Sequence, residues 1–298
     1  MQILEQTITA LGPPVWTQPL EPARAQGLLL ARWRHADARV SVGAADAVRV
    51  VLNLTAGPLV RHAERGEVTL ARSVPGQVSV MSAGVASETV VEGRADIVQI
   101  FFRPEGLGGR TDQVPADAVS HAELKRAVLR LLVAARQTDG PRQRRAAAQL
   151  QRLVVTVLAS GVGGTHTDLP PGVRPLAVRR AEGLVSEAME HSVWPELAEM
   201  AAAARLSVSH FVRLFRRAAG VTPHQWVIAR RLEQAMELLS QPDARVADVA
   251  EAAGFASPAH FVATFRQRLG VTPGAYRQAL GGPAPEHDHF SIPQVPGC

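Results

Sequence analysis

Cysteine is almost absent from this sequence of 298 residues, and the single one, Cys298, is its last residue. No disulfide can therefore form within the chain, and we expect a reducing compartment, the cytoplasm. The sequence also lacks any run of about 18 apolar residues, so we expect no membrane span. Its first residues, MQILEQTITALG, lack the basic segment with which a signal peptide begins.

Lysine is just as rare, because Lys125 is the only one. Nearly all of the positive charge is therefore arginine, and the formal net charge is +5. A basic chain favours an anionic partner. A compositional bias explains the arginine as well as phosphate recognition does, so composition leaves these two explanations open. Hydrophobic residues at 46% and charged residues at 20% indicate a globular chain, and its length allows two domains.

One segment near the C-terminus occurs twice. The first copy begins at Ser207 and reads SVSHFVRLFRRAAGVTPHQW, and the second begins at Ser257 and reads SPAHFVATFRQRLGVTPGAY. Ser, His, Phe, Val, Arg, Gly, Thr and Pro recur in register, and Trp226 corresponds to Tyr276. Two copies are too few for a solenoid. We interpret the segment as one supersecondary unit that is used twice.

Each copy carries the start and stop signals of a helix. Ser207 and Ser257 suit the N-cap, and Pro258 suits the first helical turn. Gly220 and Gly270 suit the left-handed residue that follows a helix. A Thr-Pro pair after each glycine then predicts the start of a further helix.

The side chains of each repeated helix separate into two faces at 3.6 residues per turn. One face is predicted to be core, namely Phe211, Leu214 and Phe215 in the first copy and Phe261, Thr264 and Phe265 in the second. Shorter helices are expected just before each copy, over Trp194–Ala204 and Val246–Ala253. A short helix, a tight turn and a capped helix with a basic outer face form the helix-turn-helix pattern.

The tandem unit resembles the DNA-binding domain of AraC/XylS-type bacterial transcriptional regulators, most densely in VADVAEAAGFASPAHFVATFRQRLGVTPGAYR, Val246 to Arg277. The likeness covers roughly the last third of the chain. It implies double-stranded DNA and RNA polymerase as partners, with both recognition helices in successive segments of the major groove. Arg205 departs from the family, which has a small residue in this turn. A left-handed backbone there would strain Arg205, so this turn is expected to differ from that of the second copy.

The outward positions of the two repeated helices are the predicted DNA-binding residues: Ser209, Val212, Arg213, Arg216 and Arg217 in the first, and Ala259, Val262, Ala263 and Arg266 in the second. Arginine can bond guanine in a bidentate manner, whereas alanine and valine can only touch a thymine methyl group. No Asp or Glu occurs in residues 200–232 or 252–285, which is what a phosphate-facing surface needs. We expect His210 and His260 to be structural or to contact phosphate.

The first half of the sequence is rich in strand signals. Between residues 25 and 104, short apolar or alternating runs are separated by Gly, Pro and Asp, which predicts a sandwich or small barrel. In the family that the C-terminal third resembles, this part is often a cupin-like barrel, and PGQVSVM at Pro75 looks like its strand entry. The expected fold class is thus α+β.

No metal, cofactor or catalytic residue is expected in this barrel. A metal cupin carries a His-x-His pair, whereas His35, His62 and His121 are scattered. The close pair His62 and Glu64 is interpreted as a solvated face of a strand. The large aromatic residues could line a ligand cavity or simply fill the core, and both interpretations stay open for Trp33, Phe101 and Phe102.

The pattern becomes helical after Ser120. Two apolar stripes, around residues 124–132 and 146–158, predict an antiparallel helix pair. The resemblance implies a role for this pair in forming a homodimer, and the alternative is that the pair only covers the barrel. The expected domains are a cupin-like sensing and dimerisation domain at 1–160, a linker at 161–173, a double helix-turn-helix domain at 174–281 and a disordered Pro-rich tail at 282–298.

We therefore hypothesise a cytoplasmic, ligand-responsive, sequence-specific transcription factor without enzymatic activity. Two alternatives remain: a cupin-type enzyme that carries a DNA-binding domain, and a non-specific architectural DNA binder. A fused DNA-repair alkyltransferase is excluded, because the only thiol is that of Cys298. The sequence identifies neither a small-molecule effector nor an operator.

Overall fold

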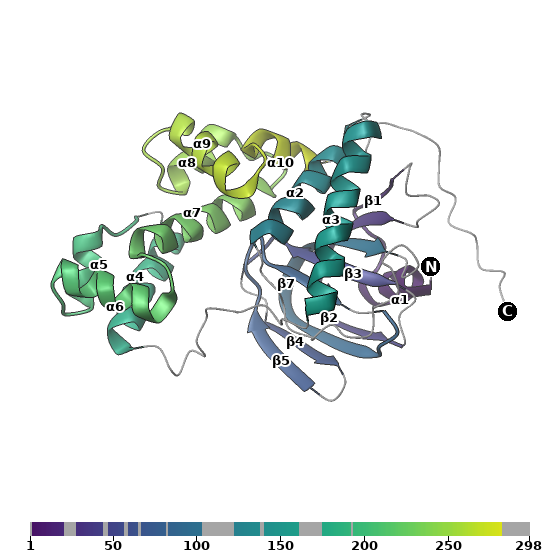
Figure 1. Ribbon diagram of the computed structural model, residues 1–298, viewed down its shortest axis with the longest axis horizontal. Helices are drawn as coiled ribbons and strands as arrows, with labels where there is room; N and C mark the ends of the chain where they lie inside the picture. The colour runs from purple at the N-terminus through teal and green to yellow at the C-terminus, as the bar shows by residue number, and fades with distance from the viewer. Residues whose placement is uncertain are drawn as a thin grey trace.

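An antiparallel sheet lies in the N-terminal half of the chain, and the described part of the C-terminal half is helical (Figure 1). The computed structural model describes residues 2–20, 28–43, 47–56, 59–64, 67–81, 83–102, 122–137, 140–160, 175–191 and 193–281. The expected α+β class is confirmed. The predicted linker at 161–173 and the predicted tail at 282–298 lie outside the described residues.

In the described residues the sheet has seven strands, and every pair of neighbours is antiparallel. The order is β1-β2-β7-β3-β6, and β4 pairs with both β7 and β5. Their bounds are β1 Trp16–Pro19, β2 Leu29–Val42, β3 Val48–Asn53, β4 Leu59–Glu64, β5 Glu67–Arg72, β6 Val78–Met81 and β7 Ser87–Phe102. The long strand β7 organises the sheet, because it pairs with β2 along one edge and with β3 and β4 along the other.

The two longest strands, β2 and β7, differ from the short runs that were expected between residues 25 and 104. In β2 the register shifts between Ala36 and Ala38, where Asp37 has a φ of 47°, and in β7 Gly93 has a φ of 103°. These local irregularities interrupt the alternation of side chains while the pairing continues across them. Strand β1 and the helix α1, Gln2–Leu11, were not predicted, whereas the strand expected to carry His62 and Glu64 is present as β4.

Two expectations about side chains of the sheet are settled by burial. Trp33 and Phe101 are fully buried, 6.1 Å apart in an edge-to-face arrangement, in one cluster with Ile3 of α1. They are therefore core residues. His62 was expected on a solvated face but is buried, with Nδ1 2.8 Å from Oγ1 of Thr89, because β4 pairs with β7 at this point.

The predicted helix pair is α2, Ala122–Ala135, and α3, Gly140–Ser160, which pack side by side over the sheet (Figure 1). Leu124, Val128, Leu131 and Leu132 of α2 are all fully buried. Helix α2 also contacts two helices of the C-terminal half, so it is enclosed between the sheet, α3 and those helices. Helix α3 keeps an exposed face, with Arg142, Arg144, Arg145 and Arg152.

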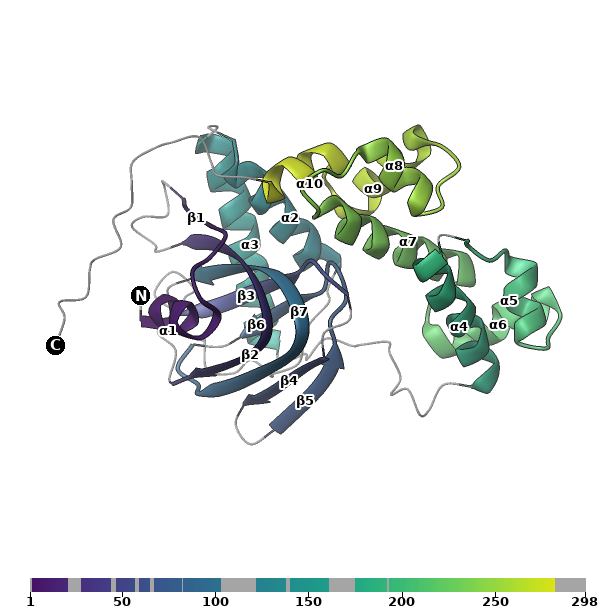
Figure 2. The ribbon, with the colours of Figure 1, turned by 180° about the vertical axis from the view of Figure 1, so that it is seen from behind.

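The C-terminal helices are α4 Leu176–His191, α5 Leu197–Ala203, α6 Val208–Ala219, α7 Pro223–Leu239, α8 Val246–Ala252, α9 Pro258–Leu269 and α10 Pro273–Leu280. We refer to α4–α6 as the first unit and to α8–α10 as the second unit. The long helix α7 connects them (Figure 2). The first unit has a hydrophobic core of its own with the start of α7, whereas the second unit shares one continuous core with the rest of α7, with α2 and α3, and with the sheet.

Arginines of the N-terminal half hold the second unit in place through helix C-termini. Arg126 Nε donates to the carbonyl of Arg268 at 2.8 Å, and Arg136 Nε donates to that of Ala279 at 3.1 Å. Arg32, which is buried and paired with Asp96, donates to the carbonyls of Leu280 and Ser240. The last carbonyls of a helix lack intrahelical partners and carry the negative end of its dipole, so cations suit them. Each of α7, α9 and α10 is bound in this way.

Candidate nucleic-acid interface

Helix α6 begins and ends where the sequence predicts. The Ser207 side chain accepts a hydrogen bond from the backbone N–H of His210 at 3.4 Å, as an N-cap does. Gly220 adopts a φ of 73°, and its N–H donates to the carbonyl of Arg216 at 2.9 Å. The next helix starts with Thr222 as its N-cap, in a reciprocal capping box with Gln225.

Helix α9 repeats this geometry. Ser257 accepts from the N–H of His260 at 3.2 Å, Pro258 occupies the first turn, and Gly270 ends the helix with a φ of 79°. Thr272 then caps α10. The predicted caps and stops of both copies are confirmed, and they place α6 and α9 equivalently within their units.

The turns before the two helices have the same backbone shape despite different residues. Arg205 has a φ of 58°, and Gly254, at the equivalent position, has a φ of 73°. The following N–H groups, of Leu206 and Phe255, donate back into the preceding short helices at 3.0 and 2.9 Å. The left-handed backbone that would strain Arg205 is therefore present, and the expectation that the two turns differ is wrong. Gly254 has a second reason to be glycine, because a Cβ there would clash with the indole ring of Trp194.

The inward faces of α6 and α9 are aromatic. Phe211 and Phe215 are fully buried and meet edge to face at 5.5 Å, and Phe261 and Phe265 do the same in the second copy. The predicted core positions Leu214 and Thr264 are partly buried. Burial of these rings fixes the rotation of each helix, and so decides which residues face outward.

The structure places the nine predicted DNA-binding residues on two equivalent outer faces. Seven of them are exposed, namely Ser209, Arg213, Arg216, Arg217, Ala259, Ala263 and Arg266. Val212 and Val262 are partly buried, and Val262 packs against the shared core, so these two lie at the flank of each face. In each unit, burial of the two phenylalanine rings turns the predicted DNA-binding side chains of that helix toward one exposed face.

The four arginines of these faces are free for an external anion. Arg213, Arg216, Arg217 and Arg266 form no ion pair or hydrogen bond through their side chains with any residue in the described part of the chain. Two other arginines within residues 200–232 do have partners, and both lie on α7 rather than on a recognition helix. Arg230 pairs with Glu233 at 2.9 Å, and Arg231 stacks on Trp194 at 5.1 Å. Burial also lowers the pKa of Arg231.

The two histidines at the repeat's fixed position are exposed. His210 and His260 each contribute their backbone N–H to the serine cap, and the His260 ring meets Phe255 edge to face at 5.6 Å. Among the described residues, no group of three or more His, Cys, Asp or Glu side chains is arranged to hold a metal ion. Within the same ranges, no helix is long and apolar enough to cross a membrane.

Part of the chain is similar in sequence to known proteins. Residues 200–279 match the family model of a helix-turn-helix domain. The chain is 38% identical over 61 residues to the probable transcriptional regulator LumQ of Photobacterium leiognathi, which is 20% of this chain and 25% of that protein. It is 32% identical over 128 residues to the transcriptional activator NphR of a Rhodococcus species, which is 42% of this chain and 38% of that protein.

A solved structure of the DNA-binding domain of AdpA, a global transcriptional factor, in complex with a target DNA is 39% identical to the matched region. It covers 34% of this chain and 91% of that one, with a TM-score of 0.32. The matched regions of LumQ and NphR are 25% and 38% of those proteins, so this chain spans well under half of their length.

Proposed function

We infer that this chain, whose residues 200–279 form an AraC-type helix-turn-helix domain, is a sequence-specific DNA-binding transcription factor. One observation carries the proposal: two capped helices with matching buried rings present equivalent exposed faces, and their arginines have no partner in the described part of the chain. A helix presented in this way fits the major groove, and free arginines fit phosphates and guanine edges.

The two helices are expected to read DNA differently. Arg213 and Arg216 on α6 can make bidentate bonds to guanine, whereas Ala259 and Ala263 on α9 offer only methyl contacts. Arg266 is the one predicted cation of the second face. We propose that α6 carries most of the hydrogen-bonded readout and that α9 reads thymine methyl groups and shape in the next groove segment.

The N-terminal half is proposed to sense a small effector and to form a homodimer. Because α2 is enclosed on its outer side by the second unit, the dimer contact is assigned to the exposed face of α3 and its surroundings. RNA polymerase is the proposed further partner, and the cytoplasm the proposed location. The effector, the homodimer, RNA polymerase and the location are proposed for the whole protein because its helix-turn-helix domain is of the AraC type.

Genome-wide mapping of the sites bound by the full-length protein tests the proposal. A specific factor should yield a common motif, and the affinity for that motif should exceed the affinity for random DNA by at least about 10³ at physiological salt. Equal affinity for the two DNAs would contradict specific recognition and favour an architectural role. The neighbouring genes would also suggest the class of effector.

A further inference from the structure

Positive charge gathers on the helix pair of the N-terminal half as well as on the recognition helices. Helix α2 carries Lys125, Arg126 and Arg130, and α3 carries four arginines, whereas Glu123 is the only acid in the sequence of either helix. The four are Arg142, Arg144, Arg145 and Arg152, and all of them are exposed. The function proposed above uses none of this charge.

One edge of α3 holds three of these arginines. At 3.6 residues per turn, Arg142, Arg145 and Arg152 lie within about 80° of one another around the helix axis. Gln149 lies on the same edge, and its Oε1 accepts a hydrogen bond from Nη1 of Arg130 on α2 at 3.4 Å. Arg130 is exposed. This edge of α3 therefore faces the exposed side of α2, which continues the row of arginines.

The exposed side of α2 leads on to the end of the recognition helix α9. Arg130 lies against the turn that ends α9, because a Cβ on Gly270 would lie 3.2 Å from the Nε of Arg130. One turn earlier in α2, Arg126 donates from Nε to the carbonyl of Arg268 at 2.8 Å. Figures 1 and 2 show α3, α2 and the second unit side by side in this order. We refer to the following residues as the arginine stripe: Arg126, Arg130, Arg142, Arg145 and Arg152.

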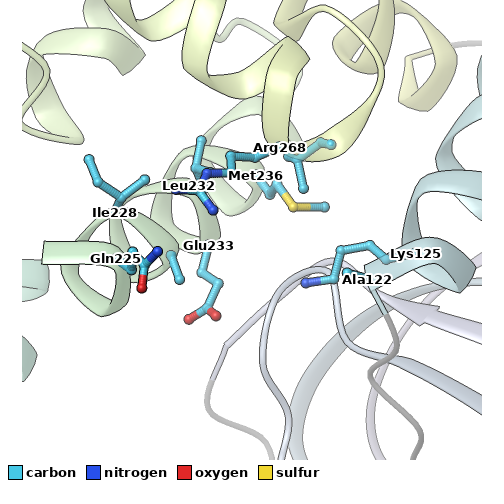
Figure 3. A pocket seen from close by; sticks show the side chains of 10 residues that line it. Ala122, Lys125, Gln225, Ile228, Leu232, Glu233, Met236 and Arg268 are labelled. Atoms are coloured by element: carbon cyan, nitrogen blue, oxygen red, sulfur yellow. The ribbon is translucent and has the colours of Figure 1, made fainter. Parts of the chain in front are cut away.

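Further cations lie where the stripe meets α9. Arg266, in the last turn of α9, is exposed and belongs to the second predicted DNA-binding face. Arg268 of the same turn lines the pocket between α2, α7 and α9 (Figure 3). The side chains of Arg145, Arg152 and Arg268 form no ion pair or hydrogen bond with any residue in the described part of the chain. Their charge is therefore available to an external anion.

We propose that the arginine stripe binds the phosphate backbone of the DNA duplex just beyond the segment that α9 reads. The proposal rests on the function inferred above and adds the N-terminal half to the surface that contacts DNA. Arginine side chains without partners fit phosphates, which a duplex presents at regular intervals whatever its sequence. The stripe should therefore add affinity and lengthen the DNA that the protein covers, without reading bases.

The packing of the second unit makes the stripe and α9 parts of one surface. Phe261 of α9 shares one continuous core with Leu124 of α2 and Leu150 of α3. Because such cores are close-packed, the stripe keeps its place relative to α9 when α9 enters the groove. From Arg142 to Arg152, α3 rises by about 15 Å, which is the axial length of about four base pairs. The stripe is thus long enough to meet several phosphates of one strand.

Charge favours DNA over a second copy of the chain as the partner of this edge of α3. A two-fold contact through the stripe would bring its arginines close to the same arginines of the other copy, and like charges repel. The opposite edge of α3, with Ala148 and Val155, carries only one arginine, Arg144. That edge remains for the homodimer contact proposed above.

The length of the DNA tests the inference on the full-length protein. The duplexes carry one copy of the mapped motif and are either short or extended at one end by about ten base pairs, one helical turn. The base positions whose preference relaxes in Arg213→Ala mark the α6 end, and the other end belongs to α9. Fluorescence anisotropy should show tighter binding when the α9 end is extended, whatever the flanking sequence, and a smaller gain when the α6 end is extended.

The double variant Arg145→Gln with Arg152→Gln should lose this gain. Removal of two phosphate contacts should reduce the slope of log K against log salt by about 2 between about 50 and 200 mM salt, and should weaken binding to the extended DNA on the order of tenfold or more. Arg145→Lys with Arg152→Lys should retain most of the gain, because lysine also binds phosphate. The matched control, Arg39→Gln with Arg94→Gln, removes the same charge from exposed positions of the sheet and should change the slope little.

Several results would overturn the assignment. One is the absence of any gain in the wild type, or a gain that survives in the glutamine variant. Another is an equal loss in the matched control, or on short and extended DNA alike, which would reflect only the overall charge of the protein. A shifted dimerisation equilibrium in sedimentation velocity, with an unchanged dependence on DNA length, would assign the stripe to the contact between copies.

Failure of this inference is distinguishable from failure of the proposed function. A preference for the motif over random DNA on short duplexes, without any gain from the flank, would refute the role of the stripe and leave the transcription factor intact. A protein without that preference, whose glutamine variant still loses affinity for long random DNA, would refute specific recognition and retain the stripe as a phosphate-binding surface.

Discussion

Arg213 and Ala263 occupy equivalent positions on the two recognition helices, and both are exposed. A guanidinium group and a methyl group present different chemistry to a base edge, since only the former donates hydrogen bonds. The two recognition helices therefore share one backbone geometry and differ in the chemistry of single outward-facing side chains. This makes substitution at residue 213 a direct probe of readout.

Arg213→Ala should lower affinity for the specific site by about 1–3 kcal/mol and relax the base preference at one or two positions. The reason is the loss of a bidentate donor from the outer face of α6. Fluorescence anisotropy on the motif and on its single-base variants measures both effects. Arg39→Ala, which removes an exposed cation of the sheet, is the control. An equal loss on specific and random DNA would show that Arg213 contacts only phosphate.

Arg205→Gly should stabilise the first unit by roughly 0.5–1 kcal/mol. A left-handed backbone costs a non-glycine residue about 1–2 kcal/mol, and the flexibility of glycine in the unfolded chain offsets part of this gain. Scanning calorimetry should report a higher transition temperature for this variant. Gly254→Ala is the opposite control, since its φ of 73° and the ring of Trp194 both oppose a Cβ. A lower transition temperature for Arg205→Gly would mean that the arginine side chain contributes more than its backbone costs.

At the scale of elements, α6 and α9 share caps, stops and ring contacts but sit in different surroundings. Phe211 belongs to a small core that contains only the first unit and the start of α7, whereas Phe261 belongs to the core that extends to the sheet. The same local structure is thus stabilised within its own unit in the first copy, and by a core that reaches the N-terminal sheet in the second copy. Truncation of the two rings should have different consequences.

Phe261→Ala should cost about 3–5 kcal/mol, the usual cost of truncating a buried aromatic residue. Because its core is continuous with that of the N-terminal half, the loss should appear in the main cooperative unfolding transition. Phe211→Ala should instead destabilise the first unit, with the protection of α9 largely retained. Hydrogen exchange resolved by segment separates the two outcomes. Unchanged exchange throughout α9 in Phe261→Ala would contradict the assigned core face.

At the scale of the whole molecule, polar contacts join the halves around a few helix ends. Glu237 of α7 is one of them, because its carboxylate accepts a hydrogen bond from the backbone N–H of Ala56 at 3.2 Å. Burial raises the pKa of Glu237, and this hydrogen bond opposes the rise only in part. The folded protein therefore holds a proton on Glu237 more tightly than the unfolded chain does, so its contribution to stability falls as pH rises through the folded pKa.

Glu237→Gln should remove this dependence. Glutamine keeps an oxygen for the Ala56 N–H but stays neutral, so the variant should be more stable than the wild type at pH 7, and the difference should shrink toward about pH 4. Urea unfolding at several pH values measures this. Glu123→Gln, an exposed change at the start of α2, is the matched control. A variant less stable at pH 7 than the wild type would show that the ionised carboxylate favours docking.

Local chemistry was sufficient to predict the double helix-turn-helix. An N-cap serine, a left-handed glycine and rings spaced at one helical turn act within a few residues of one another, and every predicted cap and stop of α6 and α9 is present in the structure. The strand-rich character of the first half was predicted for the same reason. Its continuous strands β2 and β7 were not, because a local irregularity in the sequence resembles a strand end.

Contacts between residues far apart in the chain were decided only by the tertiary structure. No pattern near Arg126 or Arg136 indicates that each would bind the end of a helix more than a hundred residues away. Such contacts depend on how the two halves pack, and their free energy comes from surfaces that are buried only after both have folded. Local sequence signals are sufficient to predict the recognition helices α6 and α9. How the second unit packs against the N-terminal half is decided only by the fold of the whole chain.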